Sequence, residues 1–272
     1  MDVIVADSRG KGLEKELRKL HPSPQSVQVV YESGARLAAI TSTAKSLLDD
    51  TVNPENHHIY VMGGYCDINE VISKKKKYIN GRKAKYQEFV FREDPESAVA
   101  RLTGLLHTAS EEISNTGAKV ILCTIPPSHL ETWNRVRLSQ KRTCMLSLTH
   151  KYTEMQTQLQ RTLVDINRAI VSINISNNSI TPRLHDTIVK KKGKGRGYKM
   201  MLERLDDGVH PTEDLRKEWA KELVRVMMKN RAPETKRVVR FTAPSSDDSD
   251  SGDDPEQSPK KRNKFIVERL FD

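Results

Sequence analysis

Two short segments near opposite ends of the chain carry a serine, an aspartate and a histidine in an arrangement suited to nucleophilic catalysis. The first reads Asp7-Ser8-Arg9-Gly10, and the second reads Asp207-Gly208-Val209-His210-Pro211. Acyl transfer to a serine needs a base beside the hydroxyl and a third group that orients the base. We therefore take Ser8 as the nucleophile and His210 as the base. Asp207 is the orienting group, because one turn of chain can bring its carboxylate to the far ring nitrogen.

Two further segments lie between these and carry glycines where an oxyanion hole would be built. They read Ser33-Gly34-Ala35 and Gly63-Gly64-Tyr65-Cys66-Asp67. Each of the four segments alone has an ordinary explanation, such as a turn after a strand or a loop that caps a helix. Their order along the chain and their positions after strands favour the catalytic interpretation.

Taken together, the four segments resemble the SGNH (GDSL-like) hydrolase superfamily over roughly residues 1–231. That family places its nucleophile in an Asp-Ser turn after the first strand, as at Ser8, and a glycine amide after the second strand, as at Gly34. Its last block is Asp-x-x-His before the C-terminal helix, which matches Asp207 to His210. The resemblance implies a flavodoxin-like three-layer α/β/α fold with a parallel sheet. It also implies hydrolysis of an ester or acetyl group, with the amides of Ser8 and Gly34 in the oxyanion hole.

The third block of the family, Gly-x-Asn-Asp, is altered in this chain. Cys66 stands where the family has the asparagine that donates to the oxyanion. A thiol is a weak donor, and loss of one such donor typically costs ~10²–10³ in turnover. Asn69 is the candidate substitute, although a shift of two residues changes the direction of its side chain. The first block also has Ala6 in place of the usual glycine.

Three interpretations of function remain open at this point. The first is an esterase or deacetylase that works slowly. The second is a catalytically impaired SGNH-like scaffold that binds nucleic acid or a protein partner, for example in a mobile-element complex, since such domains also occur in proteins of mobile elements. The third is a flavodoxin-like binding protein whose motif matches are accidental. The intact serine and Asp-x-x-His block favour the first, and Cys66, together with two basic segments described below, favours the second.

Alternating strands and helices predict a parallel sheet covered on both faces, with ligands bound at the carboxyl ends of the strands. The apolar patterns predict strands at 2–7, 27–31, 59–62 and 119–125, and helices at 11–20, 36–48, 95–115, 147–174 and 212–229. Ser8, Gly34 and Gly64 all follow strand ends, so we expect them to meet at one edge of the sheet.

The net charge of +10 is concentrated in two segments that we expect to be basic loops, at 74–85 and 190–197. Lysine and arginine clusters bind phosphates by charge, and Tyr78 and Tyr86 are placed to stack on bases. The alternative is that these loops are simply solvated. The candidate nucleic-acid-binding residues are Lys74, Lys75, Lys76, Lys77, Arg82, Lys83, Lys85, Lys190, Lys191, Lys192, Lys194 and Arg196.

The composition changes at residue 232, and the segment 232–272 is predicted to be a disordered tail of acidic and basic stretches. It contains Pro-Lys-Lys-Arg-Asn-Lys at 259–264, which resembles a nuclear import signal, and it ends in an apolar patch that suits a protein partner. We therefore expect an intracellular, nuclear protein that is not secreted. No apolar run is long enough to cross a membrane, and three cysteines without metal-ligand spacing indicate neither a metal nor a cofactor.

Overall fold

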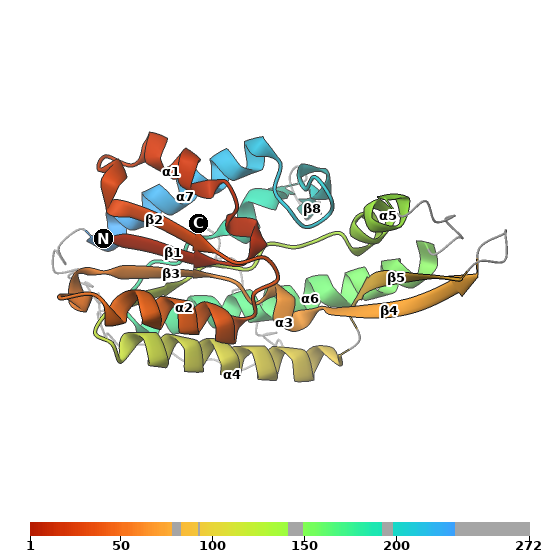
Figure 1. Ribbon diagram of the computed structural model, residues 1–272, viewed down its shortest axis with the longest axis horizontal. Coiled ribbons are helices and arrows are strands. Elements are labelled where there is room, and N and C mark those ends of the chain that lie inside the picture. The colour runs from red at the N-terminus through yellow and green to blue at the C-terminus, as the bar shows by residue number, and fades with distance from the viewer. Residues whose placement is uncertain (78–82, 92, 141–148, 192–197, 232–272) are drawn as a thin grey trace, which may run out of the picture. The chain divides into compact units, whose positions relative to one another are not determined.

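The computed structural model describes residues 1–77, 83–91, 93–140, 149–191 and 198–231 of the chain. Four parallel strands form the central sheet in the order β2-β1-β3-β6 (Figure 1). These strands are β1 (Asp2–Ala6), β2 (Val27–Tyr31), β3 (His58–Met62) and β6 (Lys119–Leu122). Their carboxyl ends meet at one edge of the sheet, as expected from the parallel arrangement.

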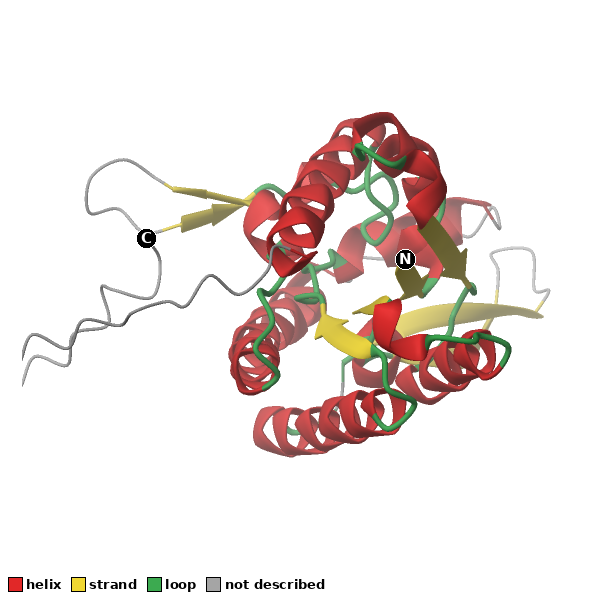
Figure 2. Cartoon of the chain, turned by 90° about the vertical axis from the view of Figure 1, so that its left-hand side faces the viewer, coloured by secondary structure: helices red, strands yellow, loops and turns green. Residues whose placement is uncertain are grey.

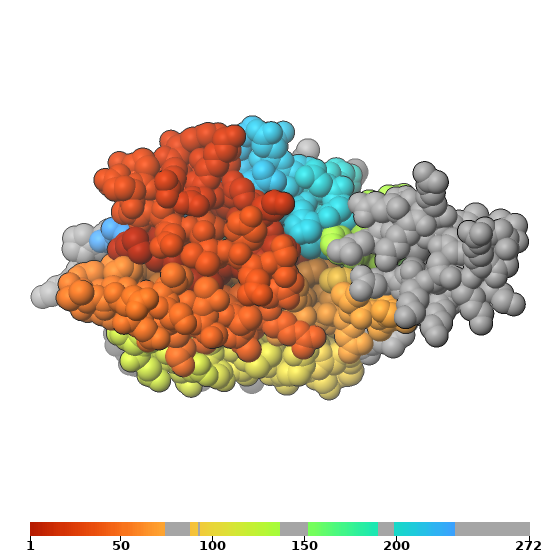
Figure 3. Space-filling view, viewed as in Figure 1, coloured from red at the N-terminus to blue at the C-terminus, as the bar shows by residue number. Residues whose placement is uncertain are grey.

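Helices cover both faces of the sheet, so the predicted three-layer α/β/α fold is confirmed. One face packs against α1 (Leu13–Leu20) and α7 (Glu213–Arg231). The other packs against α2 (Leu37–Asp49), α4 (Pro95–Ser114) and α6 (Thr149–Ser176). Figure 3 shows the N-terminal elements in contact with the C-terminal segment that contains α7, although more than 180 residues separate them in sequence.

The sheet divides its side chains between two hydrophobic cores because successive residues of a strand point to opposite faces. In β1, Val3 and Val5 belong to the core under α2, α4 and α6, whereas Ile4 and Ala6 belong to the core under α1 and α7. All four side chains are buried. Burial on both faces explains why β1 reads as a continuous apolar run rather than as an alternating pattern.

All four predicted strands and all five predicted helices are present, with ends shifted by no more than about three residues. Three features escaped the prediction. One is α5 (Leu130–Gln140), and another is the short helix α3 (Tyr65–Ile68) that follows β3. The third is a pair of hairpins, β4 (Glu70–Lys77) with β5 (Lys83–Val90) and β7 (Val189–Lys191) with β8 (Tyr198–Met200).

The hairpins correct the expectation of basic loops, because most of the segment 74–85 and the start of the segment 190–197 are strands. Figure 2 shows the two hairpins on opposite sides of the domain. Within the part of the chain that the structure describes, no helix is both long and apolar enough to cross a bilayer.

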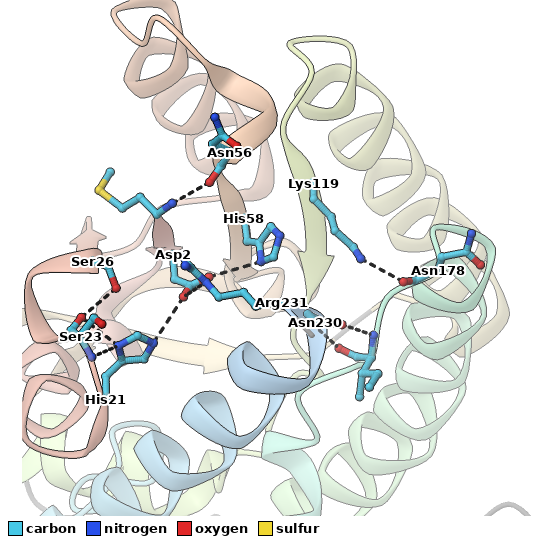
Figure 4. Close-up of polar contacts among 12 residues, drawn as sticks. Asp2, His21, Ser23, Ser26, Asn56, His58, Lys119, Asn178, Asn230 and Arg231 are labelled. Atoms are coloured by element: carbon cyan, nitrogen blue, oxygen red, sulfur yellow. Dashed lines mark hydrogen bonds and ion pairs between the residues drawn. The ribbon is translucent and has the colours of Figure 1, made fainter. Parts of the chain in front are cut away.

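A buried polar cluster closes the sheet at the end opposite the strand carboxyl ends. Asp2 is fully buried at the start of β1, and Figure 4 shows it between His21, His58 and Arg231. Arg231 Nε lies 2.8 Å from Asp2 Oδ2, and His58 Nδ1 lies 3.4 Å from Asp2 Oδ1. Because Arg231 is the last described residue of α7, this ion pair ties the end of the final helix to the first strand.

Replacing Arg231 by alanine should lower the free energy of unfolding by about 1–3 kcal/mol, because it leaves the buried Asp2 carboxylate without its charged partner. Urea unfolding followed by circular dichroism measures the change. The matched control is Lys229→Ala, which removes the same charge from an exposed position in the same helical turn. Equal losses in both variants would show that the ion pair with Asp2 contributes nothing specific.

Candidate active site

The structure brings Ser8, Asp207 and His210 together in a continuous chain of hydrogen bonds. Ser8 Oγ lies 2.9 Å from His210 Nε2, and His210 Nδ1 lies 2.7 Å from Asp207 Oδ2. Ser8 and His210 are 202 residues apart in sequence, so the contact depends on the whole fold. The two ring nitrogens thus face a hydroxyl and a carboxylate, which is the geometry needed for a serine, its general base and an orienting acid.

Asp207 is positioned by its own loop, which folds back on itself between η5 (Leu202–Arg204) and α7. Asp207 Oδ1 accepts hydrogen bonds from the amides of Val209 at 3.0 Å and His210 at 2.9 Å. Burial raises the pKa of Asp207, but these amides and the His210 ring lower it by more, so that the pKa lies below its ordinary value. The carboxylate therefore stays charged while it holds the imidazole.

Gly208 allows this loop to approach the start of α5 closely. Its φ is +87°, and a Cβ at this position would lie 2.5 Å from the carbonyl oxygen of His129. The amide of His129 also donates to the Gly208 carbonyl at 2.7 Å. No other residue combines this dihedral with this contact without displacing the backbone. Docking of the loop on α5 places Trp133 beside His210, with ring centres 5.8 Å apart.

Ser8 lies in a tight turn immediately after β1. The amide of Asp7 still donates to Met62 of β3, so the sheet ladder reaches the residue before the nucleophile. Asp7 Oδ1 then accepts from the amide of Arg9 at 2.9 Å and turns the chain into the 3₁₀ segment η1 (Ser8–Gly10). Such a side-chain-to-backbone bond is the usual way for an aspartate to start a turn.

The backbone amides of Ser8 and Gly34, which follow β1 and β2, are the ones that the sequence predicts for an oxyanion hole. Within the described residues, neither the Ser8 amide nor the Gly34 amide donates to an internal acceptor. Gly34 has a φ of +80° in the loop between β2 and α2. Asp67 anchors this loop, because its Oδ2 accepts from the amide of Leu37 at 2.9 Å. The sequence reasoning identified Ser8 and Gly34 but gave Asp67 no role, although it is the aspartate of the third block.

Cys66 lies in the first turn of α3 and is half-buried. Burial, together with the nearby charge of Asp7, raises the pKa of its thiol to about 11, so the thiol is protonated at neutral pH. Asn69 does not replace the missing asparagine. Asn69 follows α3 directly, its side-chain amide donates to the carbonyl of Tyr65 at 3.2 Å, and the residue is buried. This bond and the burial of Asn69 argue against it as an oxyanion donor.

Arg9, the residue that follows Ser8, is a buried cation that the sequence did not lead us to expect at this site. The residue is 2% exposed, and its Nη1 donates to the carbonyl of Pro126 at 2.9 Å. Burial raises the pKa of Asp7, and the charge of Arg9 opposes that rise. The signal that could have identified Arg9 is its position immediately after Ser8, where the Gly-Asp-Ser-Leu motif has leucine.

Three aromatic side chains form a wall that links Arg9 to His210, and we call Tyr65, Phe89 and Trp133 the aromatic wall. The Arg9 guanidinium carbon lies 4.0 Å from the centre of the Tyr65 ring. Tyr65 stacks on Phe89 with ring centres 6.0 Å apart, and Phe89 meets Trp133 edge-on at 5.2 Å. Trp133, at the end of this wall, thus lies against the imidazole.

The remaining candidate residues are distributed differently from the triad. Lys74 to Lys77 lie in β4, Lys83 and Lys85 in β5, and Lys190 and Lys191 in β7. Arg82, Lys192, Lys194, Arg196 and Tyr78 lie outside the described residues, as does the tail 232–272 with its nuclear signal. Nuclear localisation and a partner for the tail stay predictions. In the described ranges, no group of three or more histidines, cysteines and carboxylates is placed to hold a metal.

No family model and no curated protein sequence matches the chain. Its structure is similar to that of a lipolytic G-D-S-L family member from Veillonella parvula, with a TM-score of 0.52, 13% identity, and coverage of 84% of this chain and 98% of that one. It is also similar to a GDSL-like lipase from Bacteroides thetaiotaomicron, with a TM-score of 0.50, 14% identity, and coverage of 82% and 87%. The chain therefore has the fold of the SGNH (GDSL-like) hydrolases.

Proposed function

We propose that this chain, which has the fold of the SGNH hydrolases, is a serine hydrolase that cleaves an ester or acetyl group. One observation carries the proposal, namely the unbroken hydrogen-bond chain from Asp207 through His210 to Ser8. Side chains of the right types meet at the carboxyl edge of a parallel sheet, where such folds bind their ligands. A turn or a helix cap at either motif alone would not require their hydroxyl and imidazole to meet.

The first half of the reaction transfers the acyl group to the serine. His210 Nε2 takes the proton of Ser8 Oγ as the oxygen attacks the acyl carbonyl carbon. Asp207 stabilises the imidazolium that forms, since its carboxylate remains charged beside Nδ1. The tetrahedral intermediate collapses as His210 returns the proton to the leaving alcohol, and the acyl group stays on Ser8.

In the second half, a water molecule repeats these steps and releases the acid and the free Ser8 hydroxyl. In each half the carbonyl oxygen becomes an oxyanion, which the amides of Ser8 and Gly34 stabilise. The Cys66 thiol contributes a weak third donor at most. The aromatic wall excludes water from one side of His210, because Trp133 and Phe89 pack against each other beside the ring.

A fluorophosphonate probe tests whether Ser8 is an activated nucleophile. Attack of Ser8 Oγ on phosphorus expels fluoride, so the protein should gain one phosphonyl group, located on Ser8 by peptide mass spectrometry. Ser8→Ala should not be labelled, and His210→Ala should be labelled far more slowly, because the base is missing. Ser26→Ala, which removes a serine hydroxyl outside the triad, is the matched control and should label fully. Wild-type protein without an adduct would refute the proposal.

A catalytically impaired scaffold is the second candidate, and Cys66 is the observation that favours it. Loss of the asparagine donor weakens the oxyanion hole by about 10²–10³ in turnover. In that case the triad is only a structural hydrogen-bond network, and the function of the chain is to bind nucleic acid or a protein partner. The probe separates the candidates, since a scaffold without an activated serine remains unlabelled.

A further inference from the structure

The hairpin formed by β4 and β5 is a two-stranded ribbon whose register gathers positive charge. Lys75 pairs with Lys85 and Lys77 with Lys83 across the ladder. Because residues of a strand alternate between its two faces and paired residues share a face, one face of the ribbon carries Lys75, Lys77, Lys83 and Lys85. Like charges placed directly opposite each other destabilise a ladder. Repulsion between these lysines therefore destabilises the ribbon, and an anionic partner would reduce that repulsion.

The root of the ribbon is firmly attached to the domain. The side chain of Asn134, in α5, donates to the Phe89 carbonyl at 2.9 Å and accepts from the Phe89 amide at 2.7 Å. Tyr152, in α6, donates to the buried Glu88 carboxylate at 2.7 Å. Val90 at the end of β5 is also buried. These contacts attach the root of the hairpin to α5 and α6, so the ribbon starts from a fixed place on the domain.

The ribbon also leaves the domain beside the candidate active site. β4 begins directly after α3, which carries Cys66, and Figure 1 shows the ribbon extending from there beyond the four-stranded sheet. Phe89 in β5 belongs to the aromatic wall that ends at His210. A polymer bound along the ribbon would therefore run from its basic face toward the edge of the sheet that holds Ser8.

We propose that the β4–β5 ribbon is a binding surface for the phosphate backbone of a nucleic acid. A two-stranded ribbon fits the major groove of a B-form duplex, whereas the major groove of A-form RNA is too deep and narrow. Lysines contact phosphates as point charges without reading sequence, so the surface is non-specific. The net charge of +10 adds long-range attraction for such a polyanion. This inference does not depend on the proposed hydrolase activity.

Two double variants with equal change in charge test the face of the ribbon. Lys75→Gln with Lys77→Gln removes two charges from the basic face, and Lys74→Gln with Lys76→Gln removes two from the opposite face, where the partners are Tyr86 and Ala84. The probe is a fluorescent 20-base-pair DNA duplex, with a single-stranded 20-mer, an A-form RNA duplex and phosphatidylserine vesicles as parallel arms. Binding of the full chain is measured by anisotropy over a range of salt concentrations.

We expect the first variant to bind the DNA duplex at least tenfold more weakly at 0.1 M salt. Its log–log salt dependence should be shallower by about 1.8, which is 0.9 for each lost phosphate contact. The second variant should lose less than half as much affinity. Equal losses in the two variants, no binding of any nucleic acid, or binding of vesicles alone would each overturn the proposal. Unchanged circular dichroism spectra and thermal unfolding of both variants establish that they are folded.

Discussion

Ser8→Ala should lower kcat for hydrolysis of p-nitrophenyl acetate by about 10³–10⁴-fold, down to the rate in buffer. An intact serine triad is worth about 10⁶ in kcat, and the weakened oxyanion hole removes about 10²–10³ of that. This loss of kcat arises because alanine has no hydroxyl to attack the substrate and give its proton to His210. In the wild type, His210 Nε2 lies 2.9 Å from Ser8 Oγ. Steady-state kinetics with the purified full chain measures the loss.

His210→Ala should reduce kcat as much as Ser8→Ala, and the double variant should lose nothing more. This non-additivity follows because the nucleophile and its base act as one unit. Asp207→Asn should lose less, since the amide still packs beside the ring but orients the wrong tautomer. A Ser8→Ala protein that keeps a tenth of the wild-type rate would mean that the observed hydrolysis does not use this triad.

Protonation of Asp207 should not limit the activity at mildly acidic pH, which a pH profile of kcat measures. The pKa of Asp207 lies below its ordinary value of about 3.9, so its carboxylate is charged throughout the range in which a histidine titrates. By linkage, a carboxyl whose pKa is lowered in the folded state stabilises the fold above its unfolded pKa. That contribution is lost only as the pH falls through the lower, folded value. A loss of activity through protonation of Asp207 is therefore expected only as the pH approaches that lowered value.

The triad could be predicted from sequence because each member is tied to a local signal. Ser8 follows a strand that is buried on both faces and therefore reads as an unbroken apolar run. Asp207 and His210 belong to one turn, so their spacing alone indicates their contact. The parallel order of the strands then brings the two motifs to the same edge. The three layers follow from the same alternation of strands and helices.

The surroundings of the triad could not be predicted, because they depend on contacts between distant elements. Phe89 reaches Trp133 only because the hairpin root docks on α5, and nothing in the segment 83–90 indicates that contact. The ribbon itself was expected to be a loop, since a run of four lysines lacks the apolar alternation that marks a half-buried strand. Asn69 was misjudged because its amide satisfies a carbonyl in its own turn.

Cys66→Asn should raise kcat for p-nitrophenyl acetate by about 10²–10³-fold, because it restores a strong donor at the oxyanion site. The thiol is a poor donor in its present state. Burial raises its pKa to about 11, so it offers only a neutral S–H group. The residue is half-buried in the first turn of α3, and asparagine adds a carboxamide at a position that is not fully enclosed. The increase should appear in kcat, with little change in KM, because the oxyanion exists only in the transition state and the intermediates.

Cys66→Ala is the matched control, and its rate should stay within a few-fold of the wild-type rate if the thiol contributes little. Combining Cys66→Asn with Ser8→Ala should remove the whole gain, because the new donor acts only on an oxyanion formed by Ser8. A Cys66→Asn protein that is folded but no faster than Cys66→Ala would mean that the side chain at position 66 does not reach the oxyanion. Phosphonate labelling of that variant then decides between the two candidate functions. If Ser8 is labelled, the chain is a hydrolase whose oxyanion hole uses only the amides of Ser8 and Gly34. If Ser8 is not labelled, the chain is a scaffold, and binding through the β4–β5 ribbon is its remaining candidate function.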